Sequence, residues 1–289
     1  MNNIGEQQLA DLHMHSTASD GGYSPTELLQ KCVDAKLRIV SLTDHDTVSG
    51  VPTAKQIAEE NNIQFITGIE LSTRWKGQHV DILGYGIDIT SETLLNTIAF
   101  HRKMRVNRME LMVKKCQELG FNISFEEVKK VAKGDTLSRP HMAKVLVDHG
   151  IVETVKEAFD KYLTPDKPLY VEKEKEMTPK EAIDLVHSAG GIAIVAHPIL
   201  YTLDEDIYQW LLEDGLDGVE VYHRDHDEEA IERFYALAKK AEQQLGKRVF
   251  LTGGSDFHHE SFGRLGEEIG TTRLPFEEAE YLLQNVRHR

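Results

Sequence analysis

The residues best suited to chemistry lie near the start of the chain, in the run Asp11-Leu12-His13-Met14-His15. If residues 9–15 form a strand, side chains alternate between its two faces, so His13 and His15 point the same way while Leu12 and Met14 point the other way. Two imidazoles on one face can bind a divalent metal ion. A bare His-x-His pair is more often structural than metal-binding, so the rest of the chain must decide.

Other apolar runs end at similar side chains. Seven segments have the length and composition of strands: residues 9–15, 38–43, 64–70, 79–85, 191–196, 218–222 and 248–252. His or carboxylate residues stand at or beside their ends: His13, His15, Asp44, His45, Asp46, Glu70, His79, His197, His223, Asp256 and His258. In a parallel β/α barrel the carboxyl ends of the strands meet on one face. The pattern therefore predicts an α/β barrel and favours metal ligation over purely structural histidines.

Helical segments separate these strands. The motif Ser24-Pro25-Thr26-Glu27 predicts a capped helix to about residue 35, and similar patterns predict helices over 51–60, 178–189 and 228–245. Residues 91–168 contain helical patterns, no convincing strand and a basic run at 101–108. We predict a barrel built from residues 8–90 and 169–289, interrupted by a helical insertion at 91–168 that covers the substrate.

Composition narrows the class of protein. The formal charge is −15, which argues against bulk binding of double-stranded nucleic acid, although a local basic patch can still meet RNA. Cys32 and Cys116 are too few for a disulfide framework, the first residues lack the pattern of a signal peptide, and no apolar run approaches the roughly 18 residues that a membrane span needs. We expect a cytoplasmic protein with no membrane partner.

Five motifs then carry a family resemblance: Asp-x-His-x-His-Ser at 11–16, Thr-Asp-His-Asp at 43–46, Gly-Ile-Glu at 68–70, Ala-His-Pro at 196–198 and Gly-Ser-Asp-x-His at 254–258. Together and in this order they resemble the PHP (polymerase and histidinol phosphatase) superfamily over nearly the whole chain. The resemblance implies a distorted seven-stranded β/α barrel with a trinuclear metal centre. It is strongest to the branch of nucleoside 3′,5′-bisphosphate phosphatases and 5′-to-3′ exoribonucleases.

The resemblance also implies a ligand set. One metal is expected at His13, His15, Glu70 and Asp256, a second at Glu70, His79 and His197, and a third at Asp20, His45 and His258. It makes His13, His15, Glu70, His197 and Asp256 the catalytic set. Imidazole and carboxylate donors suit Mn, Fe or Zn without selecting among them. Asp11, Asp44 and Asp46 are expected to orient the imidazoles, as metal-bound histidines require.

The expected reaction is phosphoester hydrolysis. A hydroxide that bridges two metals attacks phosphorus in line, and the cations neutralise the phosphoryl and leaving oxygens. Arg139 and His141, at a capped helix start, are expected to hold a second phosphate, and His223 to contact phosphate or protonate the leaving group. The expected substrates are a nucleoside 3′,5′-bisphosphate and short 5′-phosphorylated RNA, with the basic run either facing RNA or simply solvated.

Several alternatives remain open. The metals could serve a phosphatase for another small phosphomonoester such as histidinol phosphate, a metal-dependent amidohydrolase that attacks carbon, or a binding module without turnover. Cys32 and Arg38 also satisfy the Cys-x5-Arg spacing of cysteine phosphatases. That chemistry requires a cysteine in an anion-binding loop between strand and helix, whereas Cys32 falls late in a predicted helix.

Overall fold

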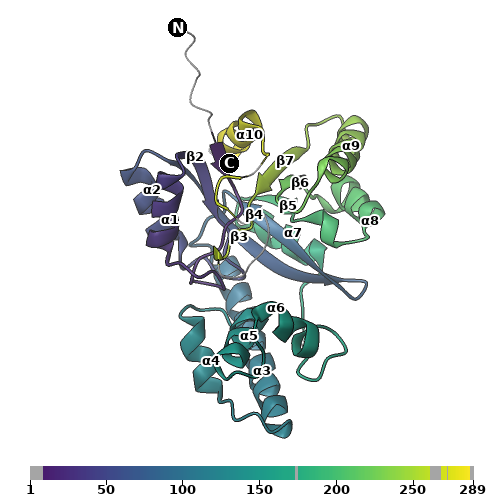
Figure 1. The fold of residues 1–289 in the computed structure, drawn as a ribbon. Coiled ribbons are helices and arrows are strands. Elements are labelled where there is room, and N and C mark those ends of the chain that lie inside the picture. Colours follow the sequence, from purple (N-terminus) through teal and green to yellow (C-terminus); the bar gives the residue numbers. More distant parts are fainter. Residues whose placement is uncertain (1–8, 173–174, 261–267, 272, 287–289) are drawn as a thin grey trace.

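The computed structural model describes residues 9–172, 175–260, 268–271 and 273–286, so the predicted domain bounds at 8 and 289 lie outside the described residues. One sheet holds seven strands in chain order: β1 (Leu9–Asp11), β2 (Leu37–Leu42), β3 (Gln64–Trp75), β4 (Gln78–Tyr85), β5 (Ile192–Val195), β6 (Gly218–His223) and β7 (Phe250–Gly254). Beyond β1, the Leu12 amide donates to the Gly253 carbonyl at 3.2 Å, and Met14 bridges to Phe257. The sheet thus nearly closes into a barrel, which confirms the predicted fold class (Figure 1).

The distortion of the barrel comes from β4, which runs antiparallel to both β3 and β5 while the other neighbours are parallel. β3 and β4 form the predicted hairpin, although β3 continues to Trp75, well past residue 70. Its turn at Lys76 and Gly77 uses positive φ angles of 47° and 82°. Because β4 is reversed, its first residues lie at the barrel face where the parallel strands end.

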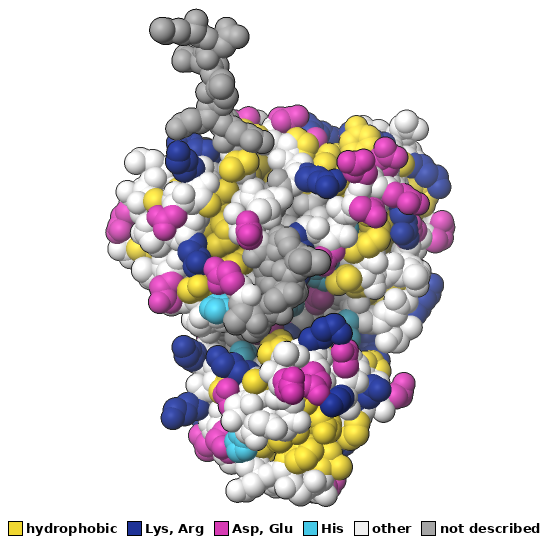
Figure 2. Space-filling model, viewed as in Figure 1, with side chains coloured by type: hydrophobic (Ala, Val, Ile, Leu, Met, Phe, Trp, Pro, Cys, Tyr) yellow, Lys and Arg dark blue, Asp and Glu magenta, His cyan; other side chains and the backbone are white. Residues whose placement is uncertain are grey.

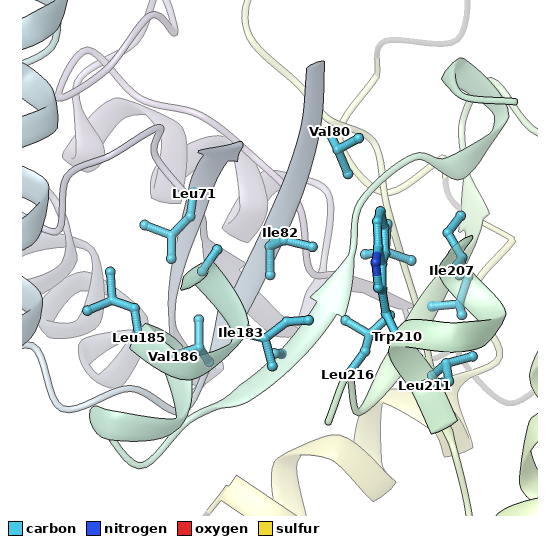
Figure 3. Packing of buried hydrophobic residues seen from close by; sticks show 14 of the residues in the cluster. Leu71, Val80, Ile82, Ile183, Leu185, Val186, Ile207, Trp210, Leu211 and Leu216 are labelled. Carbon is cyan, nitrogen blue, oxygen red and sulfur yellow. The ribbon is translucent and has the colours of Figure 1, made fainter. Parts of the chain in front are cut away.

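Helices surround the sheet. Their bounds are α1 (Pro25–Asp34), α2 (Val51–Glu60), α3 (Glu92–Glu118), α4 (Phe125–Ala132), α5 (Arg139–Asp148), α6 (Val155–Ala158), η1 (Phe159–Leu163), α7 (Pro179–Ser188), η2 (Pro198–Leu200), α8 (Asp204–Gln209), η3 (Trp210–Asp214), α9 (Glu228–Leu245) and α10 (Phe276–Val286). The predicted capping box of α1 forms between Ser24 and Glu27. Figure 3 shows α7 packing Ile183 and Val186 toward Leu71 of β3 and Ile82 of β4. This buried apolar contact anchors the hairpin that carries site residues.

The helices α3 to α6 and η1 form a separate lobe below the barrel in Figure 1. They pack around a hydrophobic cluster of their own, which runs from Met109 to Leu169. The long helix α3 connects the lobe to the barrel, and its buried His101, Arg105 and Arg108 belong to the basic run. No helix among the described residues has the length and apolarity to cross a bilayer.

Candidate metal centre

The chain after β1 positions the first two imidazoles. It stays extended because the His15 amide donates to the Phe257 carbonyl at 2.9 Å and the Thr43 amide donates to the Met14 carbonyl at 3.0 Å. Leu12 and Met14 are fully buried in hydrophobic clusters on one side. His13 and His15 face the other side, as the alternation predicts, and their Nε2 atoms lie 3.2 and 3.1 Å from Glu70 Oε2.

Glu70 is the centre of the cluster. Besides His13 and His15, His45 places Nδ1 3.2 Å from Glu70 Oε2, and His197 places Nε2 3.0 Å from Oε1. Burial alone would raise the pKa of Glu70, but the imidazoles, His45 and His13 foremost, hold this pKa well below its ordinary value. The structure therefore brings together four imidazoles from three separate segments around one buried carboxylate.

Asp256 and His258, which follow β7, complete the cluster from the other side. Asp256 Oδ1 lies 3.2 Å from His15 Nε2 and 3.6 Å from His13 Nε2. The His258 ring stacks on His15 with centroids 4.1 Å apart, and its Nε2 lies 3.4 Å from Asp20 Oδ1. Asp20, His45 and His258 therefore share one corner of the cluster with His15.

The spacing of these donors suits metal ions. Ligand atoms that share one ion at about 2.0–2.2 Å lie roughly 3.0–3.5 Å apart. The contacts from Glu70 Oε2 to His13, His15 and His45 are 3.1–3.2 Å. Several of these inward-facing atoms, including His13 Nε2, both ring nitrogens of His15 and Asp20 Oδ1, are buried without a hydrogen-bond partner among the described residues. Buried polar atoms at such spacing fit divalent cations.

The electrostatics of the cluster point the same way. Burial disfavours a charged imidazole, yet the closely placed carboxylates of Asp256 and Glu70 raise the pKa of His15 to about 10. Glu70 likewise raises the pKa of His197 to about 9 against the effect of burial. Carboxylates that stabilise protonated imidazoles this strongly create a negative potential that also attracts divalent cations, which bind by displacing the imidazole protons.

A carboxylate that the sequence analysis missed orients the ligands from behind. Glu220 Oε1 lies 3.0 Å from His13 Nδ1, and Oε2 accepts the His197 amide at 2.7 Å. Tyr201 places its hydroxyl 2.9 Å from His197 Nδ1. A lone carboxylate between Val219 and Val221 in an apolar strand was the available signal, because alternation turns it away from the residues that pack outside the barrel.

Asp11 and Asp44, which were expected to orient imidazoles, instead accept hydrogen bonds from neighbouring loops. Asp44 accepts hydrogen bonds from the Ser16 amide at 2.7 Å, the Ser16 hydroxyl at 2.7 Å and the Ser19 hydroxyl at 2.6 Å. Asp11 accepts the Ser255 and Gly270 amides at 3.0 and 3.1 Å. These carboxylates hold the loops that carry the ligands, and Glu220 is the one that contacts an imidazole directly.

The predicted ligand His79 lies at the edge of the cluster, and its role stays a prediction. Its Nδ1 lies 3.5 Å from Glu176 Oε1, and it lines the cavity beside the cluster without joining the three closely spaced donor groups found among the described residues. Asp81 instead groups with His45 and Glu70, and its Oδ2 lies 3.9 Å from His197 Nε2. His79 and Asp81 are two residues apart on one face of β4, and the register pairs Asp81 with Ser72, nearer to Glu70 than the partner of His79.

A cavity of about 260 Å³ opens from the cluster toward the helical lobe. Its barrel side includes Asp20, His45, His79, Asp81, His197, Asp256 and His258. Its lobe side includes the guanidinium groups of Arg105, Arg108 and Arg139. The basic run therefore turns largely inward, and Arg105 and Arg108 are site residues that the sequence analysis treated only as part of a possible RNA-facing helix.

The three arginines differ in how they are held. Arg105 Nε donates to Asp46 at 2.7 Å, and Arg108 Nε donates to the Val171 carbonyl at 2.6 Å. Arg139 Nη1 donates to the Leu163 carbonyl at 3.3 Å. Arg108 Nη2 is buried without a hydrogen-bond partner among the described residues. Burial, and then the charges of Arg139 and Arg105, lower the pKa of Arg108 to about 10. Guanidinium groups gathered in this way have the charge and the donors that suit an anion.

The other two predicted substrate contacts do not line this cavity with Arg139. His141 is buried, and its Nδ1 accepts the Ser138 amide at 3.1 Å as part of the cap of α5. Burial also lowers the pKa of His141. His223 is buried within the metal centre, where its Nε2 lies 3.7 Å from Asp256 Oδ2 and its ring lies 5.5 Å from that of His197.

The proposed cysteine chemistry is not supported by the geometry. Cys32 lies inside α1, fully buried, and its Sγ contacts the Met14 sulfur at 3.7 Å. Arg38 lies on β2. Burial raises the pKa of the Cys32 thiol, which disfavours the thiolate that a nucleophile requires.

A β/α barrel whose strand ends gather histidines and carboxylates around one central glutamate is typical of a metal-dependent hydrolase. The model of the PHP domain family matches residues 11–189, and the chain belongs to this family. It is 34% identical over 252 residues to a 5′-3′ exoribonuclease of Haemophilus influenzae, covering 86% of this chain and 89% of that protein. It is 32% identical to a 3′,5′-nucleoside bisphosphate phosphatase of Chromobacterium violaceum, covering 91% and 90%.

Solved structures agree with this assignment. A Bifidobacterium adolescentis protein named as a metal-dependent phosphoesterase superposes with a TM-score of 0.85 at 27% identity, covering 96% of each chain. The protein is therefore a PHP-family phosphoesterase that depends on divalent metal ions.

Proposed function

We propose that the protein removes the 3′-phosphate of nucleoside 3′,5′-bisphosphates and trims short 5′-phosphorylated RNA from its 5′ end in the cytoplasm. The observation that carries this proposal is the single cavity with a metal-ligand cluster on one wall and Arg105, Arg108 and Arg139 on the opposite wall. A ligand that satisfies both walls needs one phosphoester to be cleaved and a second anionic group to be held. The named activities of the relatives fit these two substrates.

We assign the metal ions, up to three and of the Mn, Fe or Zn type, to His13, His15, Asp20, His45, Glu70, Asp81, His197, Asp256 and His258. When bound, they would supply an activated water and neutralise phosphoryl oxygens. The chain contributes orientation. Glu220 and Tyr201 fix the ligand imidazoles, and the arginines hold the remote phosphate so that the scissile one reaches the cluster.

The arginine wall also separates the alternatives. Histidinol phosphate carries an ammonium group, which Arg108 and Arg139 would repel, while Asp46 balances the charge of Arg105. An amide substrate of an amidohydrolase has no need of a second anion site. Arg108 already has an unsatisfied Nη2 atom and a pKa lowered to about 10, so a second cation would add to an unfavourable charge cluster.

Arg139→Ala tests the proposal. Loss of a charge-assisted contact costs roughly 1.5–3 kcal/mol, which corresponds to about a 10- to 150-fold fall in kcat/KM for adenosine 3′,5′-bisphosphate. An aryl phosphate has no second anion, so its hydrolysis should change little. Arg102→Ala is the matched control, because Arg102 pairs with Asp135 and does not line the cavity. Equal losses on both substrates would refute the anion-binding role.

The RNA activity has its own deciding comparison. If the arginines hold a terminal phosphate, RNA with a 5′-phosphate should be trimmed much faster than the same RNA with a 5′-hydroxyl. Both substrates are assayed with Mn, Fe or Zn added in turn, and released nucleotides are separated by chromatography. Absence of any preference for the 5′-phosphate would reduce the function to an unspecified PHP phosphoesterase.

A further inference from the structure

A second, smaller cavity of about 90 Å³ lies on another side of the metal centre. Asp20 and Pro140 line both cavities, so the two meet beside the cluster. Here the lobe contributes Lys133, at the end of α4, and Lys144 of α5. The metal centre is thus flanked by arginines on one side and lysines on another.

Lys133 and Lys144 add two positive charges beside Asp20 in an otherwise acidic chain of net charge −15. Lys133 and Lys144 are exposed, and neither forms an ion pair or hydrogen bond with a side chain in the part of the chain that the structure describes. Hydrogen bonds from the Ser24 hydroxyl at 2.7 Å and the Ser24 amide at 2.8 Å lower the pKa of Glu27, and the charge of Lys133 acts in the same direction. Figure 2 shows Lys and Arg side chains on both flanks of the waist between barrel and lobe.

The cavity also has an aromatic wall. His259 lines it and stacks on Tyr23, with ring centroids 4.7 Å apart and planes inclined by 30°. Proteins that bind single-stranded nucleic acid combine a positive groove for the backbone with flat rings on which bases stack. Lys133 and Lys144 provide the positive charge, and the His259 ring stacked on Tyr23 provides the flat surface.

We infer that this cavity binds the sugar-phosphate backbone of RNA on the 3′ side of the scissile linkage. The inference rests on the proposed function, which places the 5′-phosphate at the arginines and the first linkage at the cluster. The next nucleotides must then leave on the far side of Asp20, where Lys133 and Lys144 meet their phosphates and His259 meets a base. A nucleoside bisphosphate ends at the cluster and never reaches the lysines.

The test compares a 5′-phosphorylated tetranucleotide with adenosine 3′,5′-bisphosphate in the metal-loaded protein. Lys133→Ala/Lys144→Ala should lower kcat/KM for the tetranucleotide roughly five- to thirtyfold, as expected for two partly solvated charge contacts. For the tetranucleotide, the slope of log(kcat/KM) against the logarithm of salt concentration should become shallower by about 1.4. Each lost phosphate contact contributes about 0.7 to this slope for a single strand. Hydrolysis of the bisphosphate should change by less than about twofold.

The matched control is Lys103→Ala/Lys114→Ala, which removes the same charge from exposed positions on α3 outside both cavities. It should leave both substrates unaffected. Equal losses on the tetranucleotide for the two double variants, or equal losses on both substrates for Lys133→Ala/Lys144→Ala, would overturn the inference. So would a wild-type protein that hydrolyses the bisphosphate but no RNA. Failure of the wild type on both substrates would instead contradict the proposed function.

Discussion

Arg105 connects the helical lobe to the barrel through a buried charge pair. It lies on α3, but Nε donates to Asp46 Oδ2 at 2.7 Å and Nη2 donates to Ser72 Oγ at 2.7 Å. The side chains of Arg105 and Asp46 are only 9% and 2% exposed. Asp46 also accepts the Ser72 amide at 3.0 Å. Arg105→Ala would leave this carboxylate buried beside the cavity without its guanidinium partner.

Breaking a buried pair by removing one partner costs about 3–5 kcal/mol of unfolding free energy. At about 2.1 cal/mol/K per residue, the unfolding entropy of a 289-residue chain is about 0.6 kcal/mol/K. Arg105→Ala should therefore lower Tm by roughly 5–8 °C. Arg102→Ala, which removes an exposed partner of Asp135, should cost at most about 1 kcal/mol.

The assay is calorimetric and denaturant-induced unfolding at a fixed metal concentration. Adding Asp46→Asn to Arg105→Ala removes the stranded charge and should restore at least about 2 kcal/mol of the loss, as a double-mutant cycle would show. A cost below about 1 kcal/mol for Arg105→Ala, or additive effects of the two substitutions, would refute the buried pair and the docking of α3 that depends on it.

Three further predictions concern the metal centre and the thiols. Asp81→Asn should reduce bound metal and turnover far more than His79→Ala, as measured by elemental analysis and phosphate release. The reverse order would favour His79 over Asp81 as the ligand. Asp256→Ala should abolish turnover while circular dichroism stays unchanged, and the wild type should hold more than one divalent ion per chain, whereas a constant single ion would contradict a multinuclear centre. Cys32 and Cys116 should resist alkylation in the native protein at pH 8, because burial raises both thiol pKa values, that of Cys116 to about 12; rapid native labelling would show that the thiols are not enclosed.

Much of the barrel, and the gathering of histidines and carboxylates at its strand ends, could be predicted because both depend on local patterns. An apolar run that ends in Glu70, or a His-x-His pair with Leu12 and Met14 between its polar residues, identifies a strand and the side it presents to the site. The capping box at Ser24 identified the start of α1 in the same way. Such signals survive folding because burial of the apolar partner fixes the direction of the polar one.

The register of strand pairing and the contacts between the helical lobe and the barrel could not be predicted from such patterns. The side chains of His79 and Asp81 lie on the same face of β4. Only the pairing of Asp81 with Ser72 shows which of them lies nearer Glu70. Arg105 and Arg108 share one face of α3, but a basic run on a helix is usually solvated. Their inward direction depends on Asp46 and on the main chain near Val171, which the sequence places far from them.

The two walls of the larger cavity make opposite electrostatic demands, and this contrast limits the substrate more than either wall alone. Carboxylates raise the pKa of His15 to about 10, which marks a site for positive charge. Across the cavity, burial and neighbouring guanidinium groups lower the pKa of Arg108 to about 10, which marks a site for negative charge. A phosphate compensates the second wall directly and the first through bound cations. A small ester with one phosphate can satisfy only one wall, whereas a molecule with two phosphates on one ribose can satisfy both.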